Sequence, residues 1–131
     1  MSTSSFRDLR VCQEAMKLTA EIYKATVAFP RHELNGLSQQ IRRAAVSVPS
    51  NIAEGDERKS DKDSVRFFYI AKGSLAELST QLEIARDVGY FTDAQVEPFV
   101  SQCVELGKML GALIRARSQS EPRAPSPKPR A

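Results

Sequence analysis

The sequence predicts an all-α protein folded as an antiparallel, up-and-down four-helix bundle. Its composition favours helices, because Trp is absent, Gly occurs only 6 times, and Ala, Leu, Glu, Lys, Arg and Gln dominate. Apolar residues recur every three to four positions in four stretches of about 20 residues, joined by short polar connections. We find neither a convincing strand alternation nor an internal repeat. The 131 residues are enough for one domain with a real core.

The first helix is expected from about Asp8 to Val27. One side of it should face the core, with apolar side chains at Val11, Ala15, Leu18, Ile22, Ala25 and Phe29. The helix should end at Phe29, because a residue that precedes a proline avoids the helical conformation. Residues 31–36 then form a connection.

The second helix is expected from about Leu37 to Glu54, with Gly55 as its terminator. Pro49 lies inside this helix. An internal proline removes a backbone hydrogen bond and clashes with the carbonyl four residues earlier, at a cost of about 3 kcal/mol. We therefore predict a kink at Pro49, with the freed carbonyl of Ala45 satisfied by a neighbouring hydroxyl or a water.

The third helix should follow Ser60 or Asp61 and stop at Gly89. Its predicted inner face consists of Phe67, Ala71, Ser74, Leu75, Leu78, Leu82 and Ala85.

Thr92 and Asp93 should cap the fourth helix, and Pro98 lies near its first turns. Its predicted inner face consists of Val96, Phe99, Cys103, Leu106, Leu110 and Leu113. We expect a flexible N-terminus over residues 1–7, the bundle over 8–117, and a disordered, basic, proline-rich tail over 118–131.

The charge of the chain is unevenly distributed. Residues 115–131 carry a net charge of +4, whereas the remaining chain has 14 basic and 15 acidic side chains. The basic isoelectric point therefore comes from the tail and is not evidence for nucleic-acid binding by the bundle. Because no signal peptide and no apolar run of bilayer length is present, we expect a cytoplasmic protein with no membrane partner and with reduced, buried Cys12 and Cys103.

Residues that could perform catalysis or bind a metal are scarce. A metal site in a helical bundle needs several converging His, Asp or Glu side chains, but the chain has a single histidine, His32, beside Glu33 in a connection. The two cysteines form no CxxC motif, and no glycine-rich phosphate loop occurs. The sequence therefore predicts a non-enzymatic protein with no catalytic, metal or cofactor site.

A row of mostly short polar side chains runs along the second helix beside its apolar row. The row consists of Arg43, Ser47, Ser50, Asn51 and Glu54, with Pro49 among them. The third helix offers a matching strip of Gly73, Ser74 and Glu77. Because short side chains permit close approach, we interpret the two strips as a partly buried interface in which Arg43 pairs with Glu77 or Glu54. A solvated face is the alternative.

Several segments in order resemble a known family. They are Phe6-Arg-Asp-Leu-Arg-Val11, Gln40-Ile-Arg-Arg-Ala44, Ser47-Val-Pro-Ser-Asn-Ile-Ala-Glu-Gly55 and Ala71-Lys-Gly-Ser-Leu-Ala-Glu-Leu78. Together they resemble the bacterial four-helix-bundle proteins encoded in intervening sequences of 23S ribosomal RNA genes. The accessory variability protein of diversity-generating retroelements is similar to the same proteins. The resemblance implies a homopentamer and, in the retroelement branch, binding of nucleic acid and of a reverse transcriptase.

This chain departs from the family pattern in two ways. Cys12 stands where the family usually has an aromatic residue, and the body lacks a strong excess of Lys and Arg. Two functions therefore stay open. One is an oligomeric protein that binds RNA or DNA, with candidate contacts at Arg42, Arg43, Arg58, Lys59, Lys62 and Arg66. The other is an oligomeric scaffold that binds proteins or its own copies and no nucleic acid.

Overall fold

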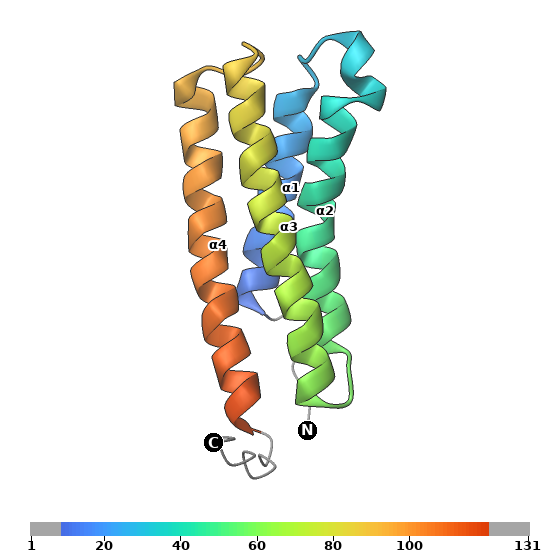
Figure 1. Ribbon diagram of the computed structural model, residues 1–131, viewed down its shortest axis with the longest axis vertical. Coiled ribbons are helices and arrows are strands. Elements are labelled where there is room, and N and C mark those ends of the chain that lie inside the picture. Colours follow the sequence, from blue (N-terminus) through green and yellow to red (C-terminus); the bar gives the residue numbers. More distant parts are fainter. Residues whose placement is uncertain (1–8, 121–131) are drawn as a thin grey trace, which may run out of the picture.

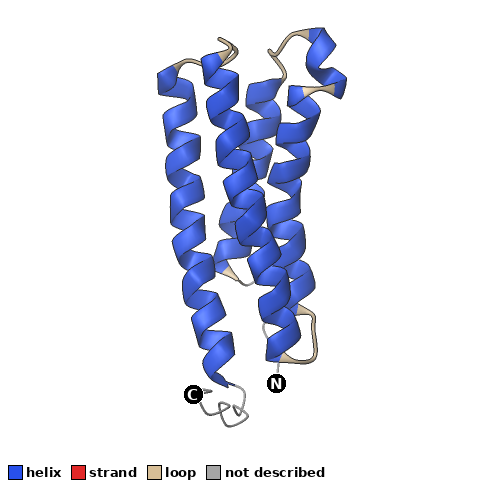
Figure 2. Ribbon diagram, viewed as in Figure 1, coloured by secondary structure: helices blue, strands red, loops and turns tan. Residues whose placement is uncertain are grey.

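The computed structural model describes residues 9–120, which form a bundle of four long helices (Figure 1). The elements are α1 (Arg10–Thr26), the 3₁₀ helix η2 (Arg31–Asn35), α2 (Leu37–Asp56), α3 (Asp61–Asp87) and α4 (Asp93–Ser120). Within this range the chain contains helices and loops only, as Figure 2 shows. The predicted all-α fold is confirmed.

The helix starts follow from local capping. The hydroxyl of Ser60 accepts the backbone N–H of Asp63 at 3.1 Å, which caps α3. Thr92 and Gln95 form a reciprocal capping box at the start of α4, with bonds of 3.1 Å and 2.8 Å. Between these helices Gly89 has a φ of 88°, a left-handed conformation that glycine adopts without strain.

Two helix ends differ from the prediction. α2 continues through Gly55 to Asp56, because Gly55 serves helix packing and does not terminate the helix. A Cβ atom at Gly55 would lie 2.6 Å from the ring of Phe68, and the Gly55 carbonyl accepts the Ser64 hydroxyl at 2.6 Å. α4 runs to Ser120, past the expected end of the bundle at residue 117. Residues 1–8 and 121–131, which include the predicted flexible N-terminus and most of the predicted tail, lie outside the described range.

The core follows the predicted apolar rows, and at two places a neighbouring residue is buried instead of the predicted one. Phe68 is the fully buried aromatic residue of α3, whereas Phe67 is only half-buried. The buried row of α3 runs from Ser64 through Phe68 and Ala71 to Leu75 at alternating spacings of four and three, so Phe67 falls on its flank. At the end of α4, Ile114 is buried in place of Leu113, which is half-buried.

The environment of Pro49 shows how an internal proline is accommodated. α2 is helical on both sides of Pro49, and the Ala45 carbonyl that loses its usual donor lies 3.0 Å from the hydroxyl of Thr19 in α1. The same hydroxyl lies 2.8 Å from the carbonyl of Ala15. The thiol of Cys12 reaches the Pro49 carbonyl at 3.8 Å. The expected neighbouring hydroxyl is therefore present and belongs to the adjacent helix, while the kink stays a prediction.

Thr19→Val should destabilise the protein by about 1 kcal/mol, because the Ala45 carbonyl then loses its donor. In a Pro49→Ala background the new backbone N–H at residue 49 can bond to Ala45, so the same substitution should be less destabilising. Urea unfolding of the unaltered protein, the two single variants and the double variant, all at one protein concentration, measures this coupling. Equal destabilisation in both backgrounds would show that Thr19 does not replace the missing donor.

Candidate functional site

Four of the six predicted nucleic-acid contacts gather at the α2–α3 turn, at one end of the bundle. Arg58, Lys59, Lys62 and Arg66 line an open hollow of about 720 Å³, together with Glu57, Ser60 and Asp63. The charged residues of this lining carry a net charge of +2. We call this group of seven residues the turn patch.

The two arginines of the turn patch are held by carboxylates and by an aromatic ring. Arg58 contacts Glu54 at 2.7 Å and Asp63 at 3.8 Å, and Arg66 contacts Asp63 at 3.0 Å. Both guanidinium groups lie over the ring of Phe67, 4.4 Å and 4.6 Å from its centroid. Their charges are therefore partly compensated and their positions fixed.

The two lysines of the turn patch flank the N-cap of α3. Lys59 and Lys62 are both exposed, on either side of Ser60. A lysine ammonium is a compact charge on a flexible stem, so it adapts to phosphates in different positions. Among the cations of the turn patch, the lysines are therefore better suited than the arginines to contact a polyanion.

Arg42 and Arg43 lie apart from the turn patch. From residue 43 to the end of α2 at residue 56 the helix axis rises roughly 20 Å, at 1.5 Å per residue. Arg42 donates to the Thr26 hydroxyl at 2.9 Å and to the Tyr23 carbonyl at 3.3 Å, and its guanidinium lies 4.9 Å from the Tyr23 ring centroid. Arg42 thus joins α2 to the end of α1, and only Arg43 keeps an exposed side chain.

The structure brings part of the predicted polar strip together. The hydroxyls of Ser47 and Ser74 are 2.7 Å apart across α2 and α3, and the Asn51 amide donates to the Ser47 carbonyl at 2.8 Å and to its hydroxyl at 3.0 Å. This hydrogen-bonded chain lies within one copy of the protein. Pro49 is half-buried beside it.

The outer members of the strip face solvent. Ser50, Gly73 and Glu77 are exposed, and a Cβ atom added at Gly73 would meet nothing within 4 Å. Glu54 pairs with Arg58 and not with Arg43, and Glu77 accepts a long 3.5 Å contact from Gln81. Within residues 9–120 the expected pairing of Arg43 with Glu77 or Glu54 is not formed.

An ion pair that no sequence pattern indicated joins α4 to the turn. Arg117 donates to Asp56 at 2.6 Å and lies 3.9 Å from Asp61, and its guanidinium is 5.5 Å from the ring centroid of Phe68. The Asp56 side chain is only 7% exposed. Because the two partners are 61 residues apart, no local spacing could reveal the pair. The pair holds the end of α4 beside the turn patch (Figure 1).

Arg117→Met should lower the free energy of unfolding by about 3 kcal/mol, because it leaves the buried Asp56 carboxylate without its cation. Arg115→Met is the matched control, since Arg115 is exposed and a surface change should stay within about 0.5 kcal/mol. Chemical denaturation measures both. Similar effects for the two variants would mean that the ion pair does not hold the end of α4.

Comparison with known proteins decides the family. The model of the family described as 23S rRNA-intervening sequence protein matches residues 7–112. The chain belongs to this family. The turn patch and the polar strip both lie within the matched range, whereas Arg117 lies beyond it. The match confirms the family that the sequence motifs had indicated.

A solved structure supports the same family assignment. The chain is similar to the crystal structure, at 1.70 Å resolution, of a protein with unknown function from the S23 ribosomal protein family of Bacteroides thetaiotaomicron. The two share 26% sequence identity and a TM-score of 0.72, over 80% of this chain and 98% of the other. A comparison with proteins of curated function gives no match.

At the opposite end of this intervening-sequence protein, Glu33 fastens η2 to the α3–α4 turn. Its carboxylate accepts the Leu37 N–H at 2.9 Å and the Tyr90 hydroxyl at 2.7 Å, and His32 lies 3.4 Å from that hydroxyl. The Leu37 N–H and the Tyr90 hydroxyl lower the pKa of Glu33, and the bond to Glu33 raises the pKa of Tyr90. These contacts cap α2 and close a loop, which is a structural role.

Folding should become less favourable in acid as Glu33 is protonated. Since its pKa is lower in the folded than in the unfolded protein, its contribution is present above the unfolded pKa, which is about 4.3, and is lost as the pH falls through the lowered folded value. In the Glu33→Gln variant the melting temperature should therefore decrease less as the pH is lowered, as thermal unfolding between about pH 2 and pH 7 would measure. An unchanged pH dependence would contradict this role.

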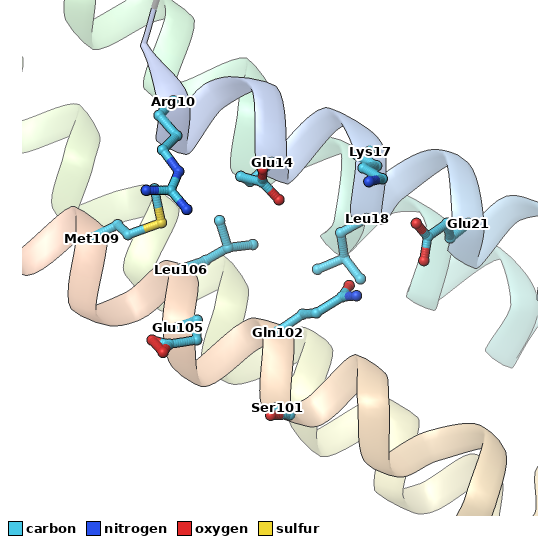
Figure 3. Close-up of a pocket in the computed structure, with 10 residues that line it drawn as sticks. All are labelled: Arg10, Glu14, Lys17, Leu18, Glu21, Ser101, Gln102, Glu105, Leu106 and Met109. Carbon is cyan, nitrogen blue, oxygen red and sulfur yellow. The ribbon is translucent and has the colours of Figure 1, made fainter.

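A second hollow lies between α1 and α4 and has a volume of about 460 Å³ (Figure 3). Its α1 side carries Arg10, Glu14, Lys17 and Glu21, so positive and negative side chains alternate, and Leu18, Leu106 and Met109 supply apolar surface. Ser101, Gln102 and Glu105 of α4 complete the lining.

No group of three or more His, Cys, Asp or Glu side chains within residues 9–120 could hold a metal ion. In the same part of the chain, every helix is too short or too polar to cross a membrane.

Proposed function

We propose that this 23S rRNA-intervening sequence protein is a non-enzymatic homo-oligomer, a pentamer, that binds RNA through the turn patch in the cytoplasm. The observation that carries the proposal is the convergence of basic residues at one end of the bundle. Arg58, Lys59, Lys62 and Arg66 line one hollow there, and α4 ends beside it. The sequence continues from that end with Arg123, Lys128 and Arg130 against one acidic residue, Glu121.

The physical basis is the attraction between these cations and RNA phosphates. A patch with a net charge of +2 is weak by itself, but an oligomer repeats it, and linked sites bind more tightly than one. The family description, which ties these proteins to a 23S rRNA gene context, supports RNA over DNA. The resemblance to retroelement accessory proteins adds a reverse transcriptase as a proposed protein partner, which co-purification with that enzyme tests.

Replacing Lys59 and Lys62 together by Ala should weaken binding to a structured RNA and reduce its salt dependence. Each phosphate contact contributes roughly 0.7 to 0.9 to the slope of log K against log salt, so the slope should fall by roughly 1.4 to 1.8. Fluorescence anisotropy with a labelled RNA hairpin, between about 50 and 200 mM salt, measures it.

Lys72→Ala with Lys108→Ala is the matched control, because both lysines are exposed on α3 and α4 and line neither hollow. The control pair should leave the slope nearly unchanged. An equal loss in both double variants would indicate diffuse attraction and no specific role for the turn patch.

A scaffold without RNA binding is the second proposed function, and a specific observation favours it. The carboxylates of Glu54 and Asp63 already pair with both arginines of the turn patch. In addition, large apolar side chains such as Met16, Val27 and Ile84 are exposed along the helices. An assembled protein whose RNA affinity is absent at low salt would establish this function and exclude the first.

A further inference from the structure

We infer that copies of this chain associate through two different surfaces, one on α1 and α2 and the other on α3. The first, the α1–α2 face, consists of Met16, Tyr23, Val27 and Val46. The second, the α3 stripe, consists of Ile70, Gly73, Glu77, Ile84 and Val88. The inference rests on the proposed homo-oligomer and names the surfaces through which it forms.

The α1–α2 face is an exposed apolar surface. Met16, Tyr23 and Val27 are 53%, 42% and 76% exposed, and their spacing of seven and four places them on one side of α1. This is the side on which Thr19 contacts Ala45 of α2. Val46, which is 39% exposed, extends the surface onto α2.

The charges around the α1–α2 face are positive. α2 contains no Asp or Glu from Leu37 to Ala53, but carries Arg42, stacked on Tyr23, and the exposed Arg43. Lys24 is exposed beside Tyr23 on α1. The acidic residues of α1, Glu14 and Glu21, line the hollow toward α4 and thus lie on the other side of the helix.

The α3 stripe is apolar with a negative surround. Ile70, Ile84 and Val88 are 43%, 44% and 56% exposed, and Glu77 lies midway between the two isoleucines. This side of α3 is the one that meets α2, through Ser74 and Ser47. Residues 70–88 include the exposed Glu77, Glu83 and Asp87 against two cations, Lys72 and Arg86, of which Arg86 contacts Asp87 and Asp93.

Gly73 gives the stripe a place for close contact. A glycine inside a helix is destabilising relative to Ala. No atom of the same chain would lie within 4 Å of a Cβ atom at Gly73, so packing within one copy does not require this glycine. A side chain from a second copy could approach the helix backbone closely here.

A second copy fits better than a foreign protein because each surface complements the other in charge. Every copy carries both a positively surrounded and a negatively surrounded apolar surface. Two different surfaces make a head-to-tail contact, which generates a closed ring when successive copies are rotated. The two surfaces lie on different helices of the bundle, with α2 in contact with both α1 and α3, so neighbouring copies must turn relative to one another.

Two variants that each lose one surface provide the test. Met16→Glu with Val27→Glu removes the α1–α2 face, and Ile70→Lys with Ile84→Lys removes the α3 stripe. Light scattering after size exclusion should report each variant alone as a monomer. An equimolar mixture should form a pair with twice the 14.5 kDa chain mass and nothing larger, because only one intact surface of each kind remains.

Val104→Glu is the control, since Val104 is 53% exposed on α4 and belongs to neither surface. It should keep the mass of the unaltered protein. Circular dichroism of each variant checks that the bundle is folded. If a double variant unfolds, Lys24→Glu and Glu77→Lys replace it: each alone should lower the assembled fraction, and mixing the two should raise it again, because every contact between unlike variants then places a lysine opposite a glutamate.

The outcomes separate this inference from the proposed function. Variants that retain the full mass would exclude the two surfaces while leaving the proposed oligomer in place. A monomeric unaltered protein would refute the oligomer itself. Monomers that fail to pair on mixing would show that the two surfaces do not bind each other.

Discussion

The position of α1 depends on how α2 resolves the missing hydrogen bond at Pro49. The hydroxyl of Thr19 lies within hydrogen-bond distance of the Ala15 carbonyl in its own helix and of the Ala45 carbonyl that the proline leaves without its usual donor, and the thiol of Cys12 reaches the Pro49 carbonyl. On its other side α1 borders the hollow toward α4, so its fixed polar contacts are made mainly with α2. A proline that would destabilise an isolated helix therefore becomes the point at which two helices are aligned.

Ion pairs at the α2–α3 turn set the balance between structure and recognition. Asp56 and Arg117 hold α4 against the turn, and Asp63 orients the arginines of the turn patch. The Asp56–Arg117 pair is partly buried, whereas the pairs of Asp63 with Arg58 and Arg66 are exposed and offset the charge of these arginines only in part. Lys59 and Lys62 are exposed beside this framework on flexible stems that adapt to phosphates in different positions, and the proposed RNA contact centres on them for that reason.

The fold could be predicted almost completely from the sequence because it depends on local patterns. Apolar spacing, Ser60, Thr92 and Gly89 determine the helices and their ends. The site was harder to predict because its contacts join residues distant in sequence. Arg42 was expected to bind nucleic acid but contacts Thr26 and Tyr23. Gly55 was expected to end α2 but makes room for the ring of Phe68, and the apolar spacing had predicted Phe67, not Phe68, as the buried residue.

The proposed assembly and the proposed RNA contact are geometrically compatible. The α1–α2 face and the α3 stripe run along the sides of the bundle, whereas the turn patch lies at its end. In a closed ring with cyclic symmetry every copy places a given residue at the same height along the ring axis. All turn patches would then lie on one rim, together with the ends of α4. A ring therefore concentrates the modest charge of each copy on a single surface, which is the arrangement that multivalent binding to an extended polyanion requires.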